Sequence, residues 1–237
     1  MDDQTVKYAD TSQIRSSFLM RMLFSAKKSK LMKLVLFVFL GPIYLISLPF
    51  IFLSSRYLFW HGKVQKLFKK KKYEEAFVYG FSKLSKWSEE KNSIKNRSWP
   101  PFQTFWCMTF AVVCESAEEI NDPDILKKLE GLYDLKPLGD TGCEVAQMLC
   151  SLARVSWVKG QKEKALDLIN KAIQSDDTYG HSYYLRAWFG EQLGREQVQS
   201  DLVMAIRNQP ELKEKIFNDE LFMQKPDLLA GIKLEVA

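Results

Sequence analysis

The residue types most often used in catalysis and metal binding are few and scattered in this chain. There are two histidines, His61 and His181, in separate segments. Neither belongs to a set of Cys, His and Asp residues with the spacing of a zinc site. The chain also has no glycine-rich phosphate loop and no nucleophile elbow. We therefore predict no enzyme: no catalytic residue, no metal and no cofactor.

Four cysteines form two pairs, Cys107/Cys114 and Cys143/Cys150, and the two members of each pair are seven positions apart. On a helix this spacing puts both members on one face, about 10.5 Å apart along the axis. A disulfide needs Cα atoms within about 7 Å, so only a bridge between the two helices is geometrically allowed. We expect the four cysteines to be reduced and to serve as small buried hydrophobic residues. Reduced cysteines slightly favour a distal domain on the cytosolic side of a membrane.

One segment dominates the hydropathy pattern. Residues 34–53 read LVLFVFLGPIYLISLPFIFL and carry no charge. Twenty helical residues cover the roughly 30 Å hydrocarbon core of a bilayer, so we predict a transmembrane helix over 34–56. A cleaved signal peptide, a buried core helix and a re-entrant wedge are the alternatives. Gly41-Pro42 should kink the helix.

Residues 1–33 form a basic tail before this segment. Ile14, Phe18, Leu19, Met22 and Leu23 recur at helical spacing within it. A short interfacial helix lying on the membrane and a frayed tail fit this pattern equally.

The charge is divided unevenly along the chain. Residues 1–53 carry net +4, residues 54–100 net +8 and residues 101–237 net −7. A nucleic-acid-binding domain should show basic residues across its folded face, so the acidic distal block argues against that class. The basic residues instead surround the apolar segment, where they attract anionic lipid headgroups.

The run Lys69, Lys70, Lys71 and Lys72 has two equally supported interpretations, a contact with anionic lipid or a solvated helix end. Six basic residues lie close before the apolar segment and seven close after it. Because the two numbers are nearly equal, the positive-inside rule does not predict which side of the membrane carries the distal domain. We expect a single-pass protein, most simply of a bacterial inner membrane, with its distal domain leaning to the cytoplasm.

After the apolar segment, hydrophobic residues recur at three- and four-residue intervals, which predicts successive helices. Residues 146–179 read AQMLCSLARVSWVKGQKEKALDLINKAIQSDDTY. This stretch resembles a tetratricopeptide repeat of 34 residues. Ala153, Ala165 and Ala172 take the small positions at which paired helices approach closely, and Gly160 makes the turn. Asp177 stands where the family usually has Pro.

The resemblance extends to less regular copies. From Gly180 onward, Ala187, Gly194 and Pro210 match a second copy, although Arg186 replaces an apolar residue. Residues 57–90 and 101–135 resemble two more, the latter divided at 121–123. The implied fold is all-α: one transmembrane helix, then an α-α superhelix of tetratricopeptide-like repeats over 57–237. Ile216, Phe217, Leu221 and Phe222 predict a short capping helix.

The resemblance also implies a binding groove. Tetratricopeptide stacks usually bind a peptide or helix through the first helix of each pair. The matching positions are Gln147, Arg154 and Trp157 in the better copy, and His181, Tyr184, Trp188 and Glu191 in the next. Trp and Arg are common interface anchors. The alternative is that Trp157 and Trp188 pack between repeats.

These observations favour a membrane-anchored scaffold or adaptor that binds a protein partner in its groove, with membrane lipid as a second contact. A structural subunit of a membrane complex and a bacterial immunity or inhibitor protein are the alternatives. The oligomeric state has no signature in the sequence.

Overall fold

The computed structural model describes residues 58–91, 100–136 and 142–235. The chain divides into two compact units, Met1–Leu53 and Ser54–Ala237, and all described residues belong to the second. The predicted basic tail over 1–33, its interfacial helix and the transmembrane helix over 34–56 therefore lie outside the described residues. Among the helices that are described, none combines the length and hydropathy needed to cross a bilayer.

The described residues confirm the all-α prediction, because their regular secondary structure is entirely helical. The first helix covers residues 58–69. It is followed by α3 (Tyr73–Lys91), α4 (Pro100–Glu118), α5 (Ile125–Asp134), α6 (Cys143–Val158), α7 (Lys162–Ser175), α8 (Gly180–Gln192), α9 (Val198–Asn208), α10 (Leu212–Phe217), α11 (Glu220–Met223) and α12 (Pro226–Glu235). The predicted division at 121–123 falls in the connection between α4 and α5.

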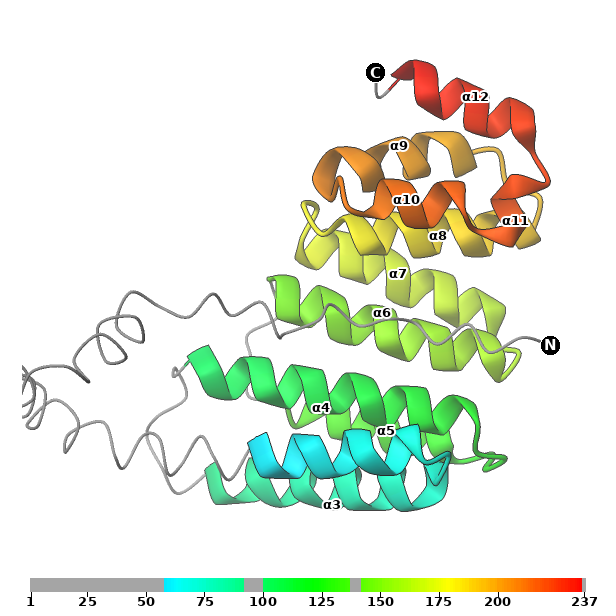
Figure 1. The fold of residues 1–237 in the computed structure, drawn as a ribbon. Coiled ribbons are helices and arrows are strands. Elements are labelled where there is room, and N and C mark those ends of the chain that lie inside the picture. The colour runs from blue at the N-terminus through cyan, green and yellow to red at the C-terminus, as the bar shows by residue number, and fades with distance from the viewer. Residues whose placement is uncertain (1–57, 92–99, 137–141, 236–237) are drawn as a thin grey trace, which may run out of the picture. The chain divides into compact units, whose positions relative to one another are not determined.

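The helices of the second unit pack in succession along the chain (Figure 1). Helix α6 packs along α7, and α8 packs along α9, each pair joined by a short turn. Helix α4 contacts both α3 and α6, and α7 contacts α8. One large hydrophobic core runs through α3 to α12, from Phe77 to Ile232.

Three helix pairs are closed by the same backbone turn. Gly160 (φ 79°) follows α6, Gly194 (φ 67°) follows α8, and Lys71 (φ 58°) follows the helix over 58–69. In each, the next residue donates its N–H to a carbonyl five positions earlier, for example Gln161 to Ser156 at 2.8 Å. This is the Schellman arrangement, which favours glycine at the residue with positive φ. The predicted turns at Gly160 and Gly194 are confirmed.

The third turn has a lysine at the left-handed position. Lys72 N donates to the carbonyl of Leu67 at 3.1 Å, and Lys71 N donates to that of Phe68 at 2.8 Å. A Cβ atom at positive φ is strained by about 1–2 kcal/mol. The lysine run is therefore also a helix terminus under backbone strain.

Small residues allow the close packing, as predicted. Ala153, Ala165 and Ala172 are completely buried. Gly180 provides another close approach, because a Cβ atom there would lie 2.6 Å from the carbonyl oxygen of Ala205 in α9. Without a side chain at Gly180, the start of α8 lies directly against the end of α9.

The predicted single capping helix is wrong in its detail. Ile216 and Phe217 belong to α10, whereas Leu221 and Phe222 belong to α11. The chain breaks between them at Asp219, whose side chain accepts a hydrogen bond from the backbone N–H of Leu221 at 3.0 Å. An N-capping aspartate starts a new helix rather than continuing the old one. Ile216 and Phe222 are nevertheless fully buried.

Candidate partner-binding face

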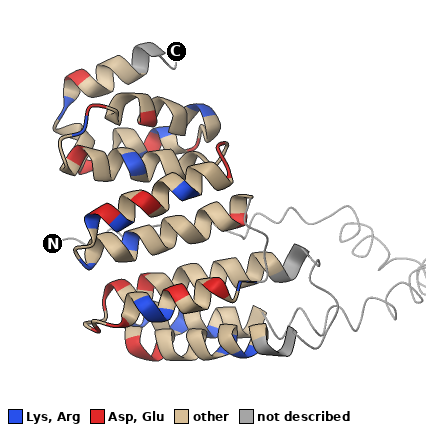
Figure 2. Cartoon of the chain, turned by 180° about the vertical axis from the view of Figure 1, so that it is seen from behind, with Lys and Arg blue, Asp and Glu red and all other residues tan. Residues whose placement is uncertain are grey.

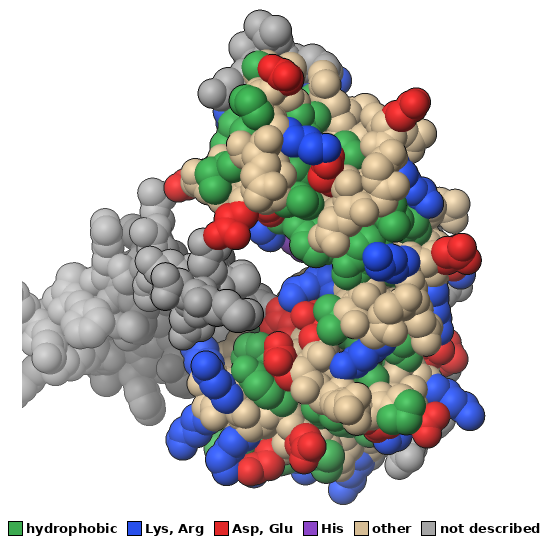
Figure 3. Space-filling model, turned by 90° about the vertical axis from the view of Figure 1, so that its right-hand side faces the viewer, with side chains coloured by type: hydrophobic (Ala, Val, Ile, Leu, Met, Phe, Trp, Pro, Cys, Tyr) green, Lys and Arg blue, Asp and Glu red, His purple; other side chains and the backbone are tan. Residues whose placement is uncertain are grey.

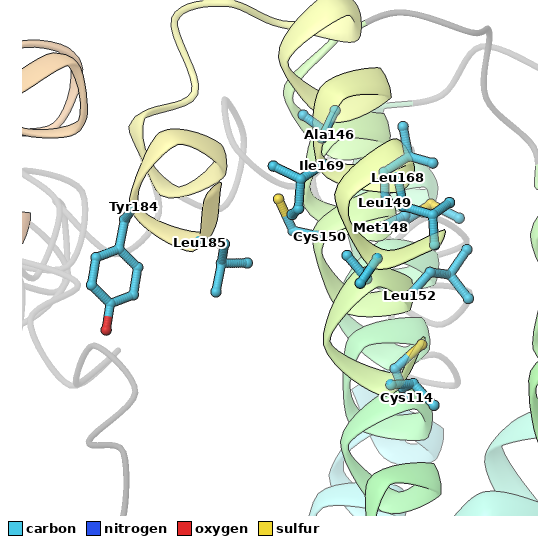
Figure 4. Close-up of a cluster of buried hydrophobic side chains, with 14 of the residues drawn as sticks. Cys114, Ala146, Met148, Leu149, Cys150, Leu152, Leu168, Ile169, Tyr184 and Leu185 are labelled. Atoms are coloured by element: carbon cyan, nitrogen blue, oxygen red, sulfur yellow. The ribbon is translucent and has the colours of Figure 1, made fainter. Parts of the chain in front are cut away.

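The seven predicted groove residues lie on two neighbouring helices. Gln147, Arg154 and Trp157 come from α6, and His181, Tyr184, Trp188 and Glu191 come from α8. The opposite side of α6 carries Leu149 and Leu152, which are buried in the core. Figure 4 shows both Leu185 and Tyr184 of α8 among the buried hydrophobic side chains, and Tyr184 is 5% exposed. Of the seven residues, Tyr184 is part of the hydrophobic core, and Trp157 and Trp188 pack against it.

Arg154 connects α6 to α4. Its Nη2 lies 3.1 Å from Glu118 Oε2, and its Nη1 lies 3.6 Å from Glu115 Oε1. The other carboxylate oxygen of Glu118 is buried and has no hydrogen-bond partner among the described residues. Burial raises the pKa of Glu118, while the Arg154 charge opposes that rise. This half-satisfied carboxylate has the capacity to accept one more hydrogen bond.

Beside Arg154 lies a cluster of aromatic and charged side chains from α8, α10 and the N-cap of α11. The rings of His181 and Tyr184 stack with centroids 5.6 Å apart. Tyr184 donates its hydroxyl hydrogen to Asp219 Oδ2 at 2.6 Å, and Lys215 Nζ lies 4.4 Å from the Tyr184 ring centre. Burial, with the nearby charges of Lys215 and Arg154, lowers the pKa of His181 to about 3. His181 is therefore neutral at physiological pH.

The contacts of Trp157 and Trp188 favour the alternative that these rings pack between repeats. Trp157 stacks on Phe189, with ring centroids 4.3 Å apart and an interplanar angle of 6°. Trp188 meets Trp157 edge to face at 6.0 Å. These contacts join α6 to α8, so both rings pack between the two helix pairs. Both tryptophans are partly buried.

The remaining two predicted residues are less central. Glu191 forms an ion pair with Lys225, between α11 and α12. Gln147 is partly buried near the start of α6, and its backbone carbonyl accepts a hydrogen bond from Ser151. We define the inner face by the residues that the structure brings together around Arg154: Glu115, Glu118, Arg154, His181, Tyr184, Lys215 and Asp219.

Four members of the inner face were not predicted from the sequence. Glu115 and Glu118 lie on α4, where the repeat pattern is irregular, and Lys215 and Asp219 lie in the C-terminal helices. Because these residues are 31 or more positions from their partners, only the packing of α4, α8 and α10 against their neighbours reveals them. Figure 3 shows the surface hollowed between the lower and upper helices, with acidic, basic and histidine side chains at its edge.

His61, the other candidate for chemistry, is packed between helices. It is 6% exposed, and its Nδ1 lies 3.2 Å from Thr109 Oγ1. Thr109 uses its hydroxyl hydrogen to bond the carbonyl of Phe105 at 2.8 Å, so His61 Nδ1 must be the donor. Burial lowers the His61 pKa. This arrangement locks one neutral tautomer and holds the helix over 58–69 against α4.

The cysteines are free thiols rather than bridges. Cys107, Cys114 and Cys150 are buried, as predicted, but Cys143 is exposed at the start of α6. Burial raises the pKa of Cys150 to about 12, which suppresses formation of a reactive thiolate. In the described residues, no group of three or more His, Cys, Asp and Glu side chains has the geometry to hold a metal ion.

The four predicted lipid-contact lysines have different surroundings. Lys69 and Lys70 are exposed at the end of the first helix. Lys71 occupies the strained turn, and Lys72 forms an ion pair with Glu75 at 2.7 Å. The run is therefore not one uniform cationic patch.

An open cavity of about 550 Å³ lies on the other side of α6, between α5 and α7. Leu149, Leu152 and Leu168 give it an apolar lining, and Glu130, Asp134 and Lys171 supply charged groups. It involves none of the seven predicted groove residues.

Comparison with known proteins gives no match, because no protein-family model, curated protein or solved structure is significantly similar to this chain.

Proposed function

We propose that this protein is a membrane-anchored adaptor whose tetratricopeptide-like helical stack binds a segment of a protein partner along the inner face. The apolar stretch over 34–53 supports the anchor. The 34-residue spacing of the turn glycines Gly160 and Gly194, each with positive φ, supports the repeat architecture. A scaffold role is consistent with helices arranged in stacked pairs.

The observation that carries the proposal is the composition of the inner face. Arg154 is 39% exposed in its side chain, yet its ion pairs with Glu115 and Glu118 already orient it. An arginine that ion pairs already hold in place loses little further conformational entropy on binding. Such residues are typical energetic centres of protein interfaces.

Site-specific photo-crosslinking in cells tests the proposal with the full chain. A photoreactive amino acid replaces Gln147, at the edge of the inner face, or Lys171, on the exposed outer side of α7. We expect a discrete protein adduct from position 147 and none from position 171. Arg154→Ala should remove that adduct while leaving the thermal unfolding curve cooperative. Adducts of equal yield from both positions, or an adduct unaffected by Arg154→Ala, would disprove binding at this face.

A further inference from the structure

The helix over 58–69 has one buried side and one exposed stripe. His61 and Val64 are buried, and Phe68 is partly buried. On the other side, Phe59, Lys63, Lys66 and Lys70 are all exposed. Their spacing of four, three and four residues places them within about 60° around a helix that turns about 100° per residue. We call these four residues the basic stripe.

The basic stripe lacks the acidic residues that normally accompany lysines on a solvated helix. No acidic residue occurs between 58 and 73, and Lys63, Lys66 and Lys70 form no ion pair with a described residue. Like charges at this spacing repel one another along a helix. Distal helices differ, since Figure 2 shows acidic and basic residues interspersed along them. On α7, for example, Lys171 pairs with Asp167.

An exposed aromatic residue begins the same stripe. Phe59 is 68% exposed and Leu58, beside it, is 53% exposed. Apolar and aromatic residues at one end, followed by lysines along one side, are the pattern of a helix lying in a membrane interface. The Lys63 Nζ lies 4.2 Å from the centre of the Tyr79 ring.

In the sequence, this stripe follows the proposed anchor closely. The apolar segment ends at Leu53, five residues before the helix begins. Five extended residues reach about 18 Å at most, so an anchor in the bilayer keeps the helix close to the headgroups.

We infer that the basic stripe is a docking surface for an anionic phospholipid bilayer, on which the helix over 58–69 lies. This inference rests on the proposed anchor for its geometry. The lysines of the basic stripe differ from the predicted lipid-contact run 69–72, with which they share only Lys70. Lys71 instead occupies the turn that ends the helix, and Lys72 pairs with Glu75. Each lysine close to an anionic surface favours the bound state by about fivefold.

Lysine footprinting with an acylating reagent tests the inference on the full chain. The chain is reconstituted in vesicles of phosphatidylcholine alone or with phosphatidylglycerol, and modification is read by mass spectrometry. We expect Lys63, Lys66 and Lys70 to be modified about fivefold more slowly in the anionic vesicles. Lys127 and Lys213, exposed on α5 and α10, serve as matched controls with equal rates in both.

A variant pair checks that the stripe causes the protection. Phe59→Glu places a negative charge on the stripe at an exposed position and should abolish the protection. Met223→Glu changes a residue that is 50% exposed on α11 and should leave it intact. Equal lysine modification in both vesicle types would overturn the inference. So would protection seen in native membranes but in neither vesicle, because that result assigns the stripe to a protein partner.

Extraction with alkaline carbonate tests separately whether the chain is anchored in the membrane. Release of the chain by carbonate would contradict the proposed anchor, whereas the lysine comparison on the vesicle-bound chain would still decide the stripe. A chain that resists carbonate but shows no lipid-dependent protection would retain the anchor and lose the stripe.

Discussion

Arg186 and Asp201 form a two-bond ion pair between α8 and α9. Arg186 Nε donates to Asp201 Oδ2 at 2.8 Å, and Nη2 donates to Oδ1 at 2.6 Å. Asp201 is 4% exposed. Arg186 also donates to Asn170 Oδ1 in α7 at 3.2 Å. A residue that departs from the apolar repeat pattern therefore joins three helices through charge and hydrogen bonds.

Arg186→Met should strongly destabilise the folded protein. It leaves the buried Asp201 carboxylate without its cation, and loss of one partner of a buried pair costs about 3 kcal/mol. Urea unfolding would measure this change. The double variant Arg186→Met/Asp201→Leu should recover part of the loss, because it removes the unpaired charge. A single variant as stable as the parent would show that the pair has no structural role.

Lys71→Gly should stabilise the folded protein. Glycine relieves the strain of positive φ, so we expect the free energy of unfolding to rise by about 1 kcal/mol. Lys69→Gly removes the same charge from a helical position and should lower stability by up to about 1 kcal/mol. Opposite signs in chemical denaturation would support the turn geometry, and equal effects would contradict it.

Gly180→Ala should destabilise the contact between α8 and α9. The added methyl group would lie 2.6 Å from the Ala205 carbonyl oxygen and 2.9 Å from Gln209 Cβ, and such overpacking costs about 1–3 kcal/mol. Gly131→Ala on α5 is the matched control. A methyl group there meets nothing within 4 Å, so it should raise stability by up to about 1 kcal/mol. Thermal unfolding of both variants at equal concentration distinguishes them.

His181 should make stability depend on pH. Its pKa in the folded protein is about 3, against about 6.5 in an unfolded chain. Below pH 6.5 the unfolded chain therefore binds a proton that the folded protein does not bind until near pH 3. This difference lowers stability by up to about 1.4 kcal/mol per pH unit as the pH falls. Unfolding of the parent and of His181→Gln from pH 7 to pH 4 would reveal the contribution as a difference in slope, and identical slopes would refute it.

The helical class and the local turn chemistry could be predicted from the sequence, because both depend on residues close together in the chain. Gly160 marks its turn through its freedom to adopt positive φ, and Ala165 marks a close contact through its size. Lys71 gave no such signal, since its turn is imposed by the packing around it. The break at Asp219 was also missed, because the apolar spacing on both sides continues through it.

The candidate site was predicted in part. Arg154, His181 and Tyr184 came from positions in a repeated pattern, and the structure brings them together. Glu118 lies 36 residues before Arg154, so no short-range pattern connects the two. Trp157 was assigned to a groove, yet its stacking on Phe189 uses most of its surface between helix pairs. The residue type of Trp157 suggested that it lies in an interface. Only the packing showed that this interface is the one between helix pairs.

The first helix is held by a core of its own. Val64, Ala76 and Val112 form a small hydrophobic cluster separate from the main one, which contains α3 through α12. Because little apolar area holds this helix, it can open while the remaining helices stay folded. Its backbone amides should therefore exchange hydrogen with the solvent before those of α6 and α7. Under the proposed anchor, a force from the bilayer would open this helix first and leave the geometry around Arg154 undisturbed.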